Sequence, residues 1–514
     1  MAKTTTVASA GLLTAVGNAG LLSAGSGGSI FLTTGWLKGN GALRANGGSG
    51  GGNGAGGRVA IVLTGAGADF ADWQGTNTAY AGGGSGAAGT VYRRTAAGVD
   101  TLILDNNDYA NNGQVATILT NGVNLNSFSN VVIARKAILG IKGDTVVDLN
   151  TFNPTLYGAA SSGLTLDSAT NVTYPAHWNI DRCTVYLQGI TNIPASVTIG
   201  TNGVLSCYQN SSAEAYKLNT AIGGNLTVLS NGLITVDGRG FGAATGPGAA
   251  SSGSANGGAH GGVSGGSSNT YGWIMAPTNF GSGGGYGSGG GAILLTVAGT
   301  TTVAAAGAIS ANGTVGLLSA GSGGSIWLTT GWLTGAGAIR ANGGNGGAAG
   351  GRVSIVLTGT GADFSTWTGT NCAYGGASAA AGTVYRQDAS AGAARGTVIV
   401  DNGNANTNLP FTCLPAFASA TEDVSRTLWV VQNKGRIGMA TNAPIWSLTV
   451  SSNSYMELAG RTLTTRLLTI TNKSYRAGTY TASELGALVS DNSGGSGSVM
   501  VLGAGSRGTV IRMR

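Results

Sequence analysis

Carboxylates are the side chains from which this sequence could most readily build a reactive site. Enzymes that cleave glycans bring two or three of them together, or combine them with a basic group. Three places bring acidic and basic residues close in sequence: Asp144 and Asp148 with Lys142, the adjacent pair Asp181-Arg182, and Asp105 with Asp108. None has a partner whose position follows from the sequence. We therefore predict no catalytic residue, and a polysaccharide lyase or hydrolase on a parallel β-helix stays open as an alternative.

Metal and thiol chemistry has little support. The chain has four cysteines and two histidines, none at metal-ligand spacing: Cys183, Cys207, Cys372, Cys413, His177 and His260. The glycine tracts also lack the Gly-Gly-x-Gly-x-Asp repeat of calcium-binding β-rolls. We predict no metal and no cofactor. The cysteines are expected to be buried thiols, and a disulfide between Cys183 and Cys207 stays open because spacing cannot decide it.

Charge argues against nucleic acid as a partner. The net charge of +7 comes from 26 Lys and Arg and 19 Asp and Glu, with nothing denser than Arg93-Arg94 or Arg135-Lys136. Nucleic-acid binding needs basic residues clustered on one face with aromatic side chains for stacking. Charged residues make up only 9% of the chain, against about 25% in a typical soluble domain. Much of the surface must therefore consist of Thr, Ser, Asn and Gly, or be covered in an assembly.

The charged residues are more informative when a long internal duplication is considered. Residues 4–106 match residues 300–402 almost in step, and the run from Leu21 to Ile30 is identical to that from Leu317 to Ile326. We call these segments the first and second copy. The charged residues kept in both copies include Arg44, Arg58, Asp69 and Asp105 in the first copy, and Arg340, Arg352, Asp363 and Asp401 in the second.

A single catalytic centre would not require these residues twice, whereas stacked structural units would. An Asp can stabilise a corner by accepting backbone N–H bonds, and an Arg can bond free carbonyl groups at the base of a loop. We interpret the eight residues as structural.

Four tryptophans are the candidates for binding: Trp36 and Trp73, with their counterparts Trp332 and Trp367. An exposed indole can lie flat against a sugar ring or a partner surface. The alternative is that these indoles pack beneath the glycine loops and serve the core.

The elements that carry these residues are predicted to be short strands. Glycine accounts for 95 of 514 residues, Glu and Lys are scarce, and Thr and Val are abundant, a composition typical of strands and turns. Gly-Gly precedes runs such as Arg58-Val-Ala-Ile-Val-Leu, and a second class of strand ends in Asn-Gly, as in residues 307–313. Such units recur roughly every 30 residues, within the period of stacked repeats.

We therefore predict an all-β fold, a parallel β-helix or β-solenoid in which each strand pairs with its equivalent one coil away. Glycine-rich loops project from the coils. A sandwich of hairpins is the alternative, because Asn-Gly is also the usual two-residue hairpin signal.

Composition divides the chain into four segments. Residues 1–106 form a glycine-rich solenoid with the first copy, 107–222 are less regular rungs, and 223–402 are glycine-rich again and contain the second copy. Residues 403–514 are predicted to be a β-rich cap or assembly segment, because an open terminal coil exposes a strand edge.

The N-terminal residues resemble a secretion signal only superficially. Lys3 precedes a mildly apolar stretch, but the segment Thr5–Gly11 reappears as Thr301–Gly307 inside the chain, so we expect it to be part of the fold. No run of apolar residues is long enough for a membrane-spanning helix.

The repeated motifs resemble a known class of proteins. The unit Gly-Ser-Gly-Gly-Ser-Ile-x-Leu-Thr-Thr-Gly with Ala-Asn-Gly-Gly and Gly-Gly-Arg-Val, in residues 25–59 and 321–353, resembles glycine-rich β-solenoid segments of large bacterial surface proteins. Residues 474–488 and 495–502 resemble the closing segments of autotransporter-like passenger proteins. Phage tail fibres and spikes use similar folds, so the resemblance implies an extracellular or virion scaffold.

The function expected from these features is structural. The first hypothesis is a non-catalytic rod, a subunit of a virion fibre or appendage that packs with copies of itself or with other structural subunits. The second is a bacterial cell-surface adhesin or filament subunit, for which surface glycans are possible ligands, and the third is the glycan-cleaving enzyme. Neither nucleic-acid binding nor membrane insertion is expected, and the predicted location is a virion or an extracellular surface.

Overall fold

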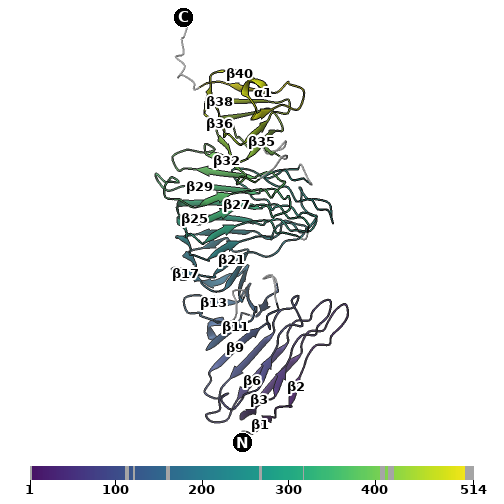
Figure 1. Ribbon diagram of the computed structural model, residues 1–514. Coiled ribbons are helices and arrows are strands. Elements are labelled where there is room, and N and C mark those ends of the chain that lie inside the picture. The colour runs from purple at the N-terminus through teal and green to yellow at the C-terminus, as the bar shows by residue number, and fades with distance from the viewer. Residues whose placement is uncertain are drawn as a thin grey trace. The chain divides into compact units, whose positions relative to one another are not determined.

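A computed structural model of the chain describes residues 3–109, 115–119, 122–157, 162–265, 269–316, 318–405, 411–414 and 422–503. Within these ranges the structure is nearly all β, and the helical elements are a 3-10 turn η1 (Leu125–Ser127) and a short α1 (Ala482–Leu485) (Figure 1). The chain divides into two compact units, Met1–Tyr208 and Gln209–Arg514. The all-β class predicted from composition is confirmed.

The first unit contains short strands separated by glycine loops. They are β1 (Thr4–Val7), β2 (Leu12–Thr14), β3 (Ser29–Thr34), β4 (Trp36–Gly39), β5 (Ala42–Arg44), β6 (Arg58–Leu63), β7 (Thr76–Thr78), β8 (Thr90–Arg94), β9 (Asp100–Asp105), β10 (Thr117–Ile118), β11 (Asn130–Ala134), β12 (Ile138–Lys142), β13 (Val146–Asp148), β14 (Thr155–Tyr157), β15 (Gly163–Asp167), β16 (Asn171–Thr173), β17 (His177–Ile180), β18 (Thr184–Gln188), β19 (Asn192–Ile193), β20 (Ser196–Ile199) and β21 (Val204–Ser206).

Strands of the first unit pair with strands about one repeat away, not with their immediate neighbours in sequence. One sheet has the order β14-β11-β9-β8-β6-β3, a second contains β10-β12-β15-β18-β21, and a third has the order β2-β5-β7. Pairing is parallel, as in Ile30 with Val59 and Val59 with Val91. The exception is the antiparallel hairpin β8–β9, which Thr95 closes by donating its N–H to Val99.

The second unit contains longer strands and a glycine-rich excursion before β25. Its strands are β22 (Leu218–Ile222), β23 (Leu226–Val228), β24 (Leu233–Thr235), β25 (Ala292–Val303), β26 (Ala308–Ser310), β27 (Ser325–Gly335), β28 (Ala338–Arg340), β29 (Arg352–Leu357), β30 (Thr370–Cys372), β31 (Thr383–Gln387), β32 (Thr397–Asp401), β33 (Thr412–Leu414), β34 (Leu428–Gln432), β35 (Arg436–Met439), β36 (Ala443–Val450), β37 (Tyr455–Glu457), β38 (Thr462–Ile470), β39 (Lys473–Tyr475), β40 (Gly478–Thr481), β41 (Val489–Ser490) and β42 (Ser498–Val501).

Parallel pairing also dominates the second unit. One series runs β25-β27-β29-β31-β32-β34-β36-β38-β42-β40, a second β24-β26-β28-β30 and a third β33-β35-β37-β41. Antiparallel pairs occur at β31–β32, β38–β39 and β40–β42. The hairpin sandwich predicts antiparallel neighbours throughout, whereas most strand pairs in the described sheets are parallel.

Alternation of side chains along each strand builds the core. In the second unit Ile326, Val353 and Val384 lie opposite one another on three successive strands, and all are buried. Successive residues point to opposite faces, so one face of each strand fills the interior. The corners between strands use the left-handed backbone region at Asn202 and Asn231, with φ of 59° and 63°, a conformation that Asn tolerates better than most residues.

The two copies fold alike. Thr4 lies opposite Trp36 in the first copy as Thr300 lies opposite Trp332 in the second. Both copies also end in the same antiparallel hairpin, β8–β9 and β31–β32. The repeated sequence therefore produces a repeated structure.

The last segment departs from the parallel pattern. β39 and β40 add antiparallel strands around β38 and β42. Thr481 is the N-cap of α1, and its backbone N–H donates to the carboxylate of Glu484 at 2.7 Å. This reciprocal cap stabilises the first turn of a very short helix.

Candidate functional site

The carboxylates singled out from the sequence are engaged in separate local contacts. Asp105 forms an ion pair with Arg135 at 2.6 Å. Lys142 pairs at 3.0 Å with Asp167, on the strand next to it, and not with Asp144 or Asp148. Asp148 accepts the N–H of Asn150 at 2.9 Å. In the described part of the chain, no group of three or more His, Cys, Asp and Glu side chains is placed to hold a metal ion.

The repeated aspartates lie at corners of the chain. Asp69 accepts the N–H of Ala71 and Asp363 that of Ser365, both at 2.9 Å. The hydrogen bonds from Ser365 hold the pKa of Asp363 below its usual value. Asp401 accepts the N–H of Gly403 at 2.7 Å. Each carboxylate therefore satisfies backbone donors in a turn.

The repeated arginines differ between the copies. Arg44 and Arg58 are exposed, whereas Arg340 is half-buried and Arg352 is only 1% exposed. The guanidinium of Arg352 donates to the backbone oxygen of Tyr271 at 2.9 Å. Equivalent residues are thus placed in different environments.

The four tryptophans divide into two classes. Trp73 and Trp367 are 5% and 6% exposed and pack in the interior, which removes them from any surface that a ligand could reach. Trp36 is half-buried and Trp332 is 38% exposed. Of the proposed binding tryptophans, the structure leaves Trp36 and Trp332 accessible.

A cleft in the first unit brings together residues that the sequence suggested only one by one. It lies where β14 and β17 do not pair with each other, at the ends of their sheets, and has a volume of about 570 Å³. Its lining includes three asparagines and two prolines with His177, Trp178, Asp181 and Cys183: Asn150, Asn153, Asn179, Pro154 and Pro175. The interruption of the sheet, which no sequence motif marks, creates the opening.

The groups in this cleft suit hydrogen bonding better than nucleophilic attack. The Nε2 atom of His177 lies 2.8 Å from the hydroxyl of Thr198. Burial raises the pKa of the Cys183 thiol to about 11, so at neutral pH it is protonated and a weak nucleophile. All four cysteines are free, so the disulfide left open from the sequence does not form.

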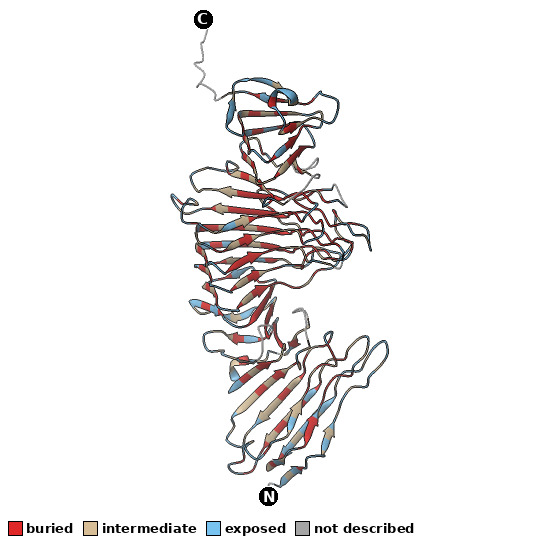
Figure 2. Cartoon of the chain, viewed as in Figure 1, coloured by how far each residue is buried: buried red, intermediate tan, exposed pale blue. Residues whose placement is uncertain are grey.

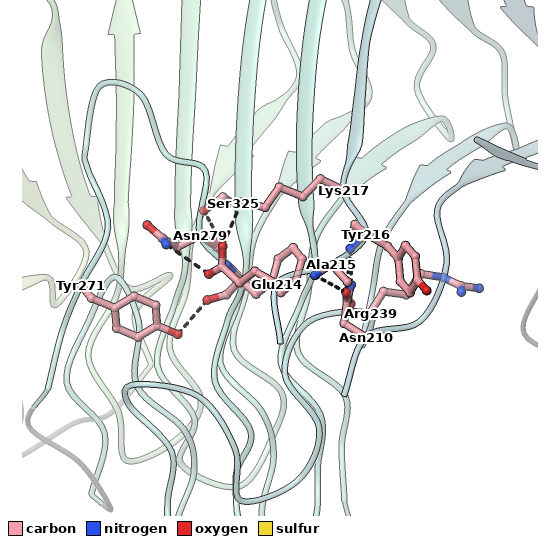
Figure 3. Close-up of polar contacts among 10 residues, drawn as sticks. Asn210, Glu214, Ala215, Tyr216, Lys217, Arg239, Tyr271, Asn279 and Ser325 are labelled. Carbon is pink, nitrogen blue, oxygen red and sulfur yellow. Dashed lines mark hydrogen bonds and ion pairs between the residues drawn. The ribbon is translucent and has the colours of Figure 1, made fainter. Parts of the chain in front are cut away.

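A second polar cluster lies in the second unit around Glu214 (Figure 3). Its carboxylate accepts the backbone N–H of Phe280 and the amide of Asn279, both at 3.1 Å, and binds the Lys217 ammonium at 2.8 Å. The Ser325 hydroxyl donates to the Asn279 carbonyl at 2.6 Å. These contacts hold the glycine-rich excursion against β27.

Next to this cluster is a buried aromatic pair. His260 and Tyr271 pack with ring centroids 4.6 Å apart, and the Tyr271 hydroxyl donates to the Phe280 carbonyl at 2.7 Å. Burial, together with the nearby Arg352 charge, lowers the pKa of His260 to about 3. The ring is therefore neutral at physiological pH, and its Nδ1 donates to the Gly323 carbonyl at 2.8 Å.

Comparisons with protein-family models, with curated proteins and with solved structures gave no significant match. No helix in the described ranges has the length and apolar character needed to cross a membrane. The described residues thus include an open cleft in the first unit and, in the second unit, polar contacts around Glu214 and His260 that serve the fold.

Proposed function

We propose that the chain is a parallel β-solenoid and acts as a non-catalytic structural or attachment subunit of a virion fibre or surface appendage. The observation that carries the proposal is the stacking of equivalent strands. β27 pairs in parallel with both β25 and β29, and β12, β15 and β18 pair in the same way. A sheet that grows by one strand per repeat forms a shaft, not a pocket.

The distribution of titratable groups supports a structural role. The described acidic residues considered above satisfy turns or pair singly with a basic residue, and their carboxylates do not converge. A glycan-cleaving site requires such convergence. The aspartates repeated in both copies accept backbone N–H groups at corners, which a shaft needs at every level.

The surface supports assembly. Charged residues are 9% of the chain, and large apolar side chains are exposed in the first copy, including Leu21 at 98% and Leu22 at 90%. Exposed apolar patches commonly mark interaction sites. We therefore expect copies of the chain, or other structural subunits, to cover part of this surface.

The experiment that tests the proposal is electron microscopy and small-angle scattering of the purified full chain. A solenoid predicts particles whose length reflects coils stacked ~4.8 Å apart. Labelling native virions or cells with an antibody to the chain then separates a fibre from a cell-surface filament. Compact globular particles would overturn the proposal.

Glycan binding at the cleft of the first unit is a second candidate, and it fits an adhesin or a glycan-cleaving enzyme. The cleft contains amide side chains beside His177 and Asp181, groups that hydrogen-bond sugar hydroxyls. Binding to a glycan array that is lost in Asp181→Asn, without release of reducing or unsaturated sugars, would indicate an adhesin. Sugar release that is lost in the same variant would indicate an enzyme.

A further inference from the structure

The antiparallel hairpin at the end of each copy packs against a loop of the same copy, with an arginine over a phenylalanine ring between them. In the first copy the guanidinium of Arg93 lies 5.4 Å from the centre of the Phe70 ring. In the second copy the equivalent Arg386 lies 5.2 Å from the centre of the Phe364 ring. Because both copies have this cation–π contact, we assign it to the fold.

The hairpin loops of the two copies differ in length and in one charged residue. In the second copy Thr397 follows its pairing partner Arg386 by eleven positions, and the corresponding loop of the first copy is three residues shorter. Two positions after the arginine, the second copy has Asp388 where the first copy has Thr95. The second copy therefore has an additional carboxylate and a longer loop beside a contact that both copies share.

An open pocket lies beside this hairpin in the second copy. Its volume is about 370 Å³, within the size range of small-molecule sites. Alternate residues of β32 are buried, and Thr397 and Ile399, which lie between them, line the pocket. Figure 2 shows this alternation of buried and half-buried residues as red and tan along the strands. The rest of the lining includes Asp363, Phe364, Arg386 and Asp388.

The charged groups of the pocket are near one another but do not pair. The Arg386 guanidinium and the Asp388 carboxylate, both half-buried, have no hydrogen-bond or ion-pair partner among the described residues. Burial, and after it the nearby Asp363 charge, raises the pKa of Asp388, and the Arg386 charge opposes this rise. Polar groups that are partly removed from water and lack partners gain from a ligand that bonds them.

The charges of the pocket restrict the chemistry of its ligand. A cation would be repelled by the guanidinium of Arg386, and an anion by the carboxylates of Asp363 and Asp388. A neutral molecule with several hydroxyl groups avoids both conflicts, because a hydroxyl accepts from a guanidinium and donates to a carboxylate. Phe364 and Ile399 add apolar surface for the C–H groups of such a molecule. A sugar ring meets all of these requirements.

We propose that this pocket of the second copy binds a neutral sugar of a glycan, with Arg386 donating to its hydroxyl oxygens and Asp388 accepting from its hydroxyl groups. Asp363 provides a second acceptor, because the hydrogen bonds from Ser365 go to its Oδ1 atom. The first copy has Thr95 in place of Asp388 and a shorter loop, so we expect no binding there. The site uses other residues than the cleft of the first unit, and the inference holds for a fibre or a cell-surface subunit alike.

A printed array of neutral glycans, followed by titration calorimetry with the glycan that the full chain retains best, tests the proposal. Asp388→Thr, which introduces the residue of the first copy, should weaken binding about tenfold through loss of one hydrogen bond to a charged group. Arg386→Ala should weaken binding at least as much. Arg93→Ala, the matched change in the first copy, should leave binding unchanged.

Several results would overturn the proposal. One is that no glycan is retained by a chain whose circular dichroism shows that it is folded. Another is binding that Asp388→Thr leaves unchanged and Asp181→Asn abolishes, which would assign the glycan to the cleft of the first unit. Equal weakening by Arg93→Ala and Arg386→Ala would show that the arginines act only through the fold.

The stability of Asp388→Thr separates a binding role from a structural one. The Asp388 carboxylate has no hydrogen-bond partner among the described residues, so its replacement should leave the denaturant midpoint of unfolding unchanged while glycan binding falls. A lower midpoint that accompanies the loss of binding would make the carboxylate a structural group and reject the proposed contact. None of these results depends on particle shape, so they remain distinct from the test of the solenoid.

Discussion

The two copies are nearly the same sequence in different surroundings. Their strands, pairing and inward residues agree, as in Val59 and Val353, which are both buried. Their outward residues do not agree, since Arg58 is exposed and Arg352 is buried under residues 271–280, the segment that we call the strap. Local sequence therefore determines the strand and its inward face, and a segment from elsewhere in the chain determines whether the outward face is core or surface.

The same difference places one type of cationic residue in two environments, and in the second copy only the Nε and Nη1 atoms of Arg352 have hydrogen-bond partners among the described residues. A buried guanidinium is costly unless its donors are bonded, and the strap supplies a carbonyl and β31 a hydroxyl to Arg352. In the first copy the charge remains in water and needs no partner. The comparison can be tested by changing equivalent residues and measuring whether the effects differ as their environments do.

The largest difference is expected for the arginines. Arg352→Ala removes the hydrogen bonds to the Tyr271 carbonyl and the Thr383 hydroxyl and should destabilise the second unit by about 3 kcal/mol. Arg58→Ala should change stability by less than about 0.5 kcal/mol, as exposed substitutions do. Calorimetry and denaturant unfolding of both variants give the comparison. Equal losses of stability in the two variants would mean that the hydrogen bond between Arg352 and the strap does not stabilise the second unit.

The second largest effect is expected from acid, which should lower the free energy of unfolding through His260. The pKa of His260 is about 3 in the folded chain, far below its ordinary value of 6.5. Between these values the unfolded chain binds the proton and the folded chain does not, so stability falls as pH falls from 6.5 toward 3. Lowering the pH from 6.5 to 5 should cost about 2 kcal/mol.

The chain offers a matched control for this pH effect. His260→Gln should flatten the dependence of the unfolding free energy on pH between 6.5 and 5. His177→Gln, which replaces an exposed histidine of the first unit, is the matched control variant. If the unfolding free energy of His260→Gln still falls between pH 6.5 and 5, another titratable group causes the pH dependence.

A smaller loss of stability, confined to the strap, is expected when Glu422 is replaced, because its carboxylate holds the strap. Glu422→Ala leaves the N–H groups of Ile274 and Met275 without their acceptor, at a cost of about 1 to 2 kcal/mol. Hydrogen exchange should rise in residues 271–280 and stay unchanged in β3 and β6. Faster exchange in the first copy as well would show that the two copies are coupled through more than their sequence.

Much of this fold could be predicted because its signals are local. Gly-Gly before Arg58-Val-Ala-Ile-Val-Leu indicates a strand, and the duplication indicates that strands recur in order. The antiparallel hairpin at Thr95 was not predicted, because a two-strand reversal inside a parallel series depends on one short turn. Neither was the burial of Arg352, because the strap that covers it lies about 80 residues earlier and contacts it only in the folded chain.

The candidate sites were harder to predict because they also depend on contacts between segments that are far apart in the sequence. The sequence offered four tryptophans as equals, and packing separates buried Trp73 and Trp367 from accessible Trp36 and Trp332. The cleft beside His177 arises where a sheet is interrupted, and an interruption leaves no residue pattern. Both the burial of the tryptophans and the interruption of the sheet depend on which strands pair across repeats. Composition and residue spacing do not predict this long-range pairing.

The smallest difference between the copies is expected at Asn106 and Asn402, which follow the repeated aspartates and are both buried in the interior. Asn106 accepts the N–H of Ala81 at 3.3 Å, and Asn402 accepts that of the equivalent Gly375 at 2.8 Å. Each side chain also donates to a loop carbonyl, Tyr109 in the first copy and Ala379 in the second. Substitution by alanine should cost about 2 kcal/mol at either position, since it leaves buried backbone groups unpaired. Denaturant unfolding should show the two costs within about 0.5 kcal/mol of each other, because each side chain is buried and makes the same two kinds of hydrogen bond. A gap above about 1 kcal/mol would instead show that covering the outward face tightens the interior behind it, and the rule that the inward face depends on local sequence alone would fail.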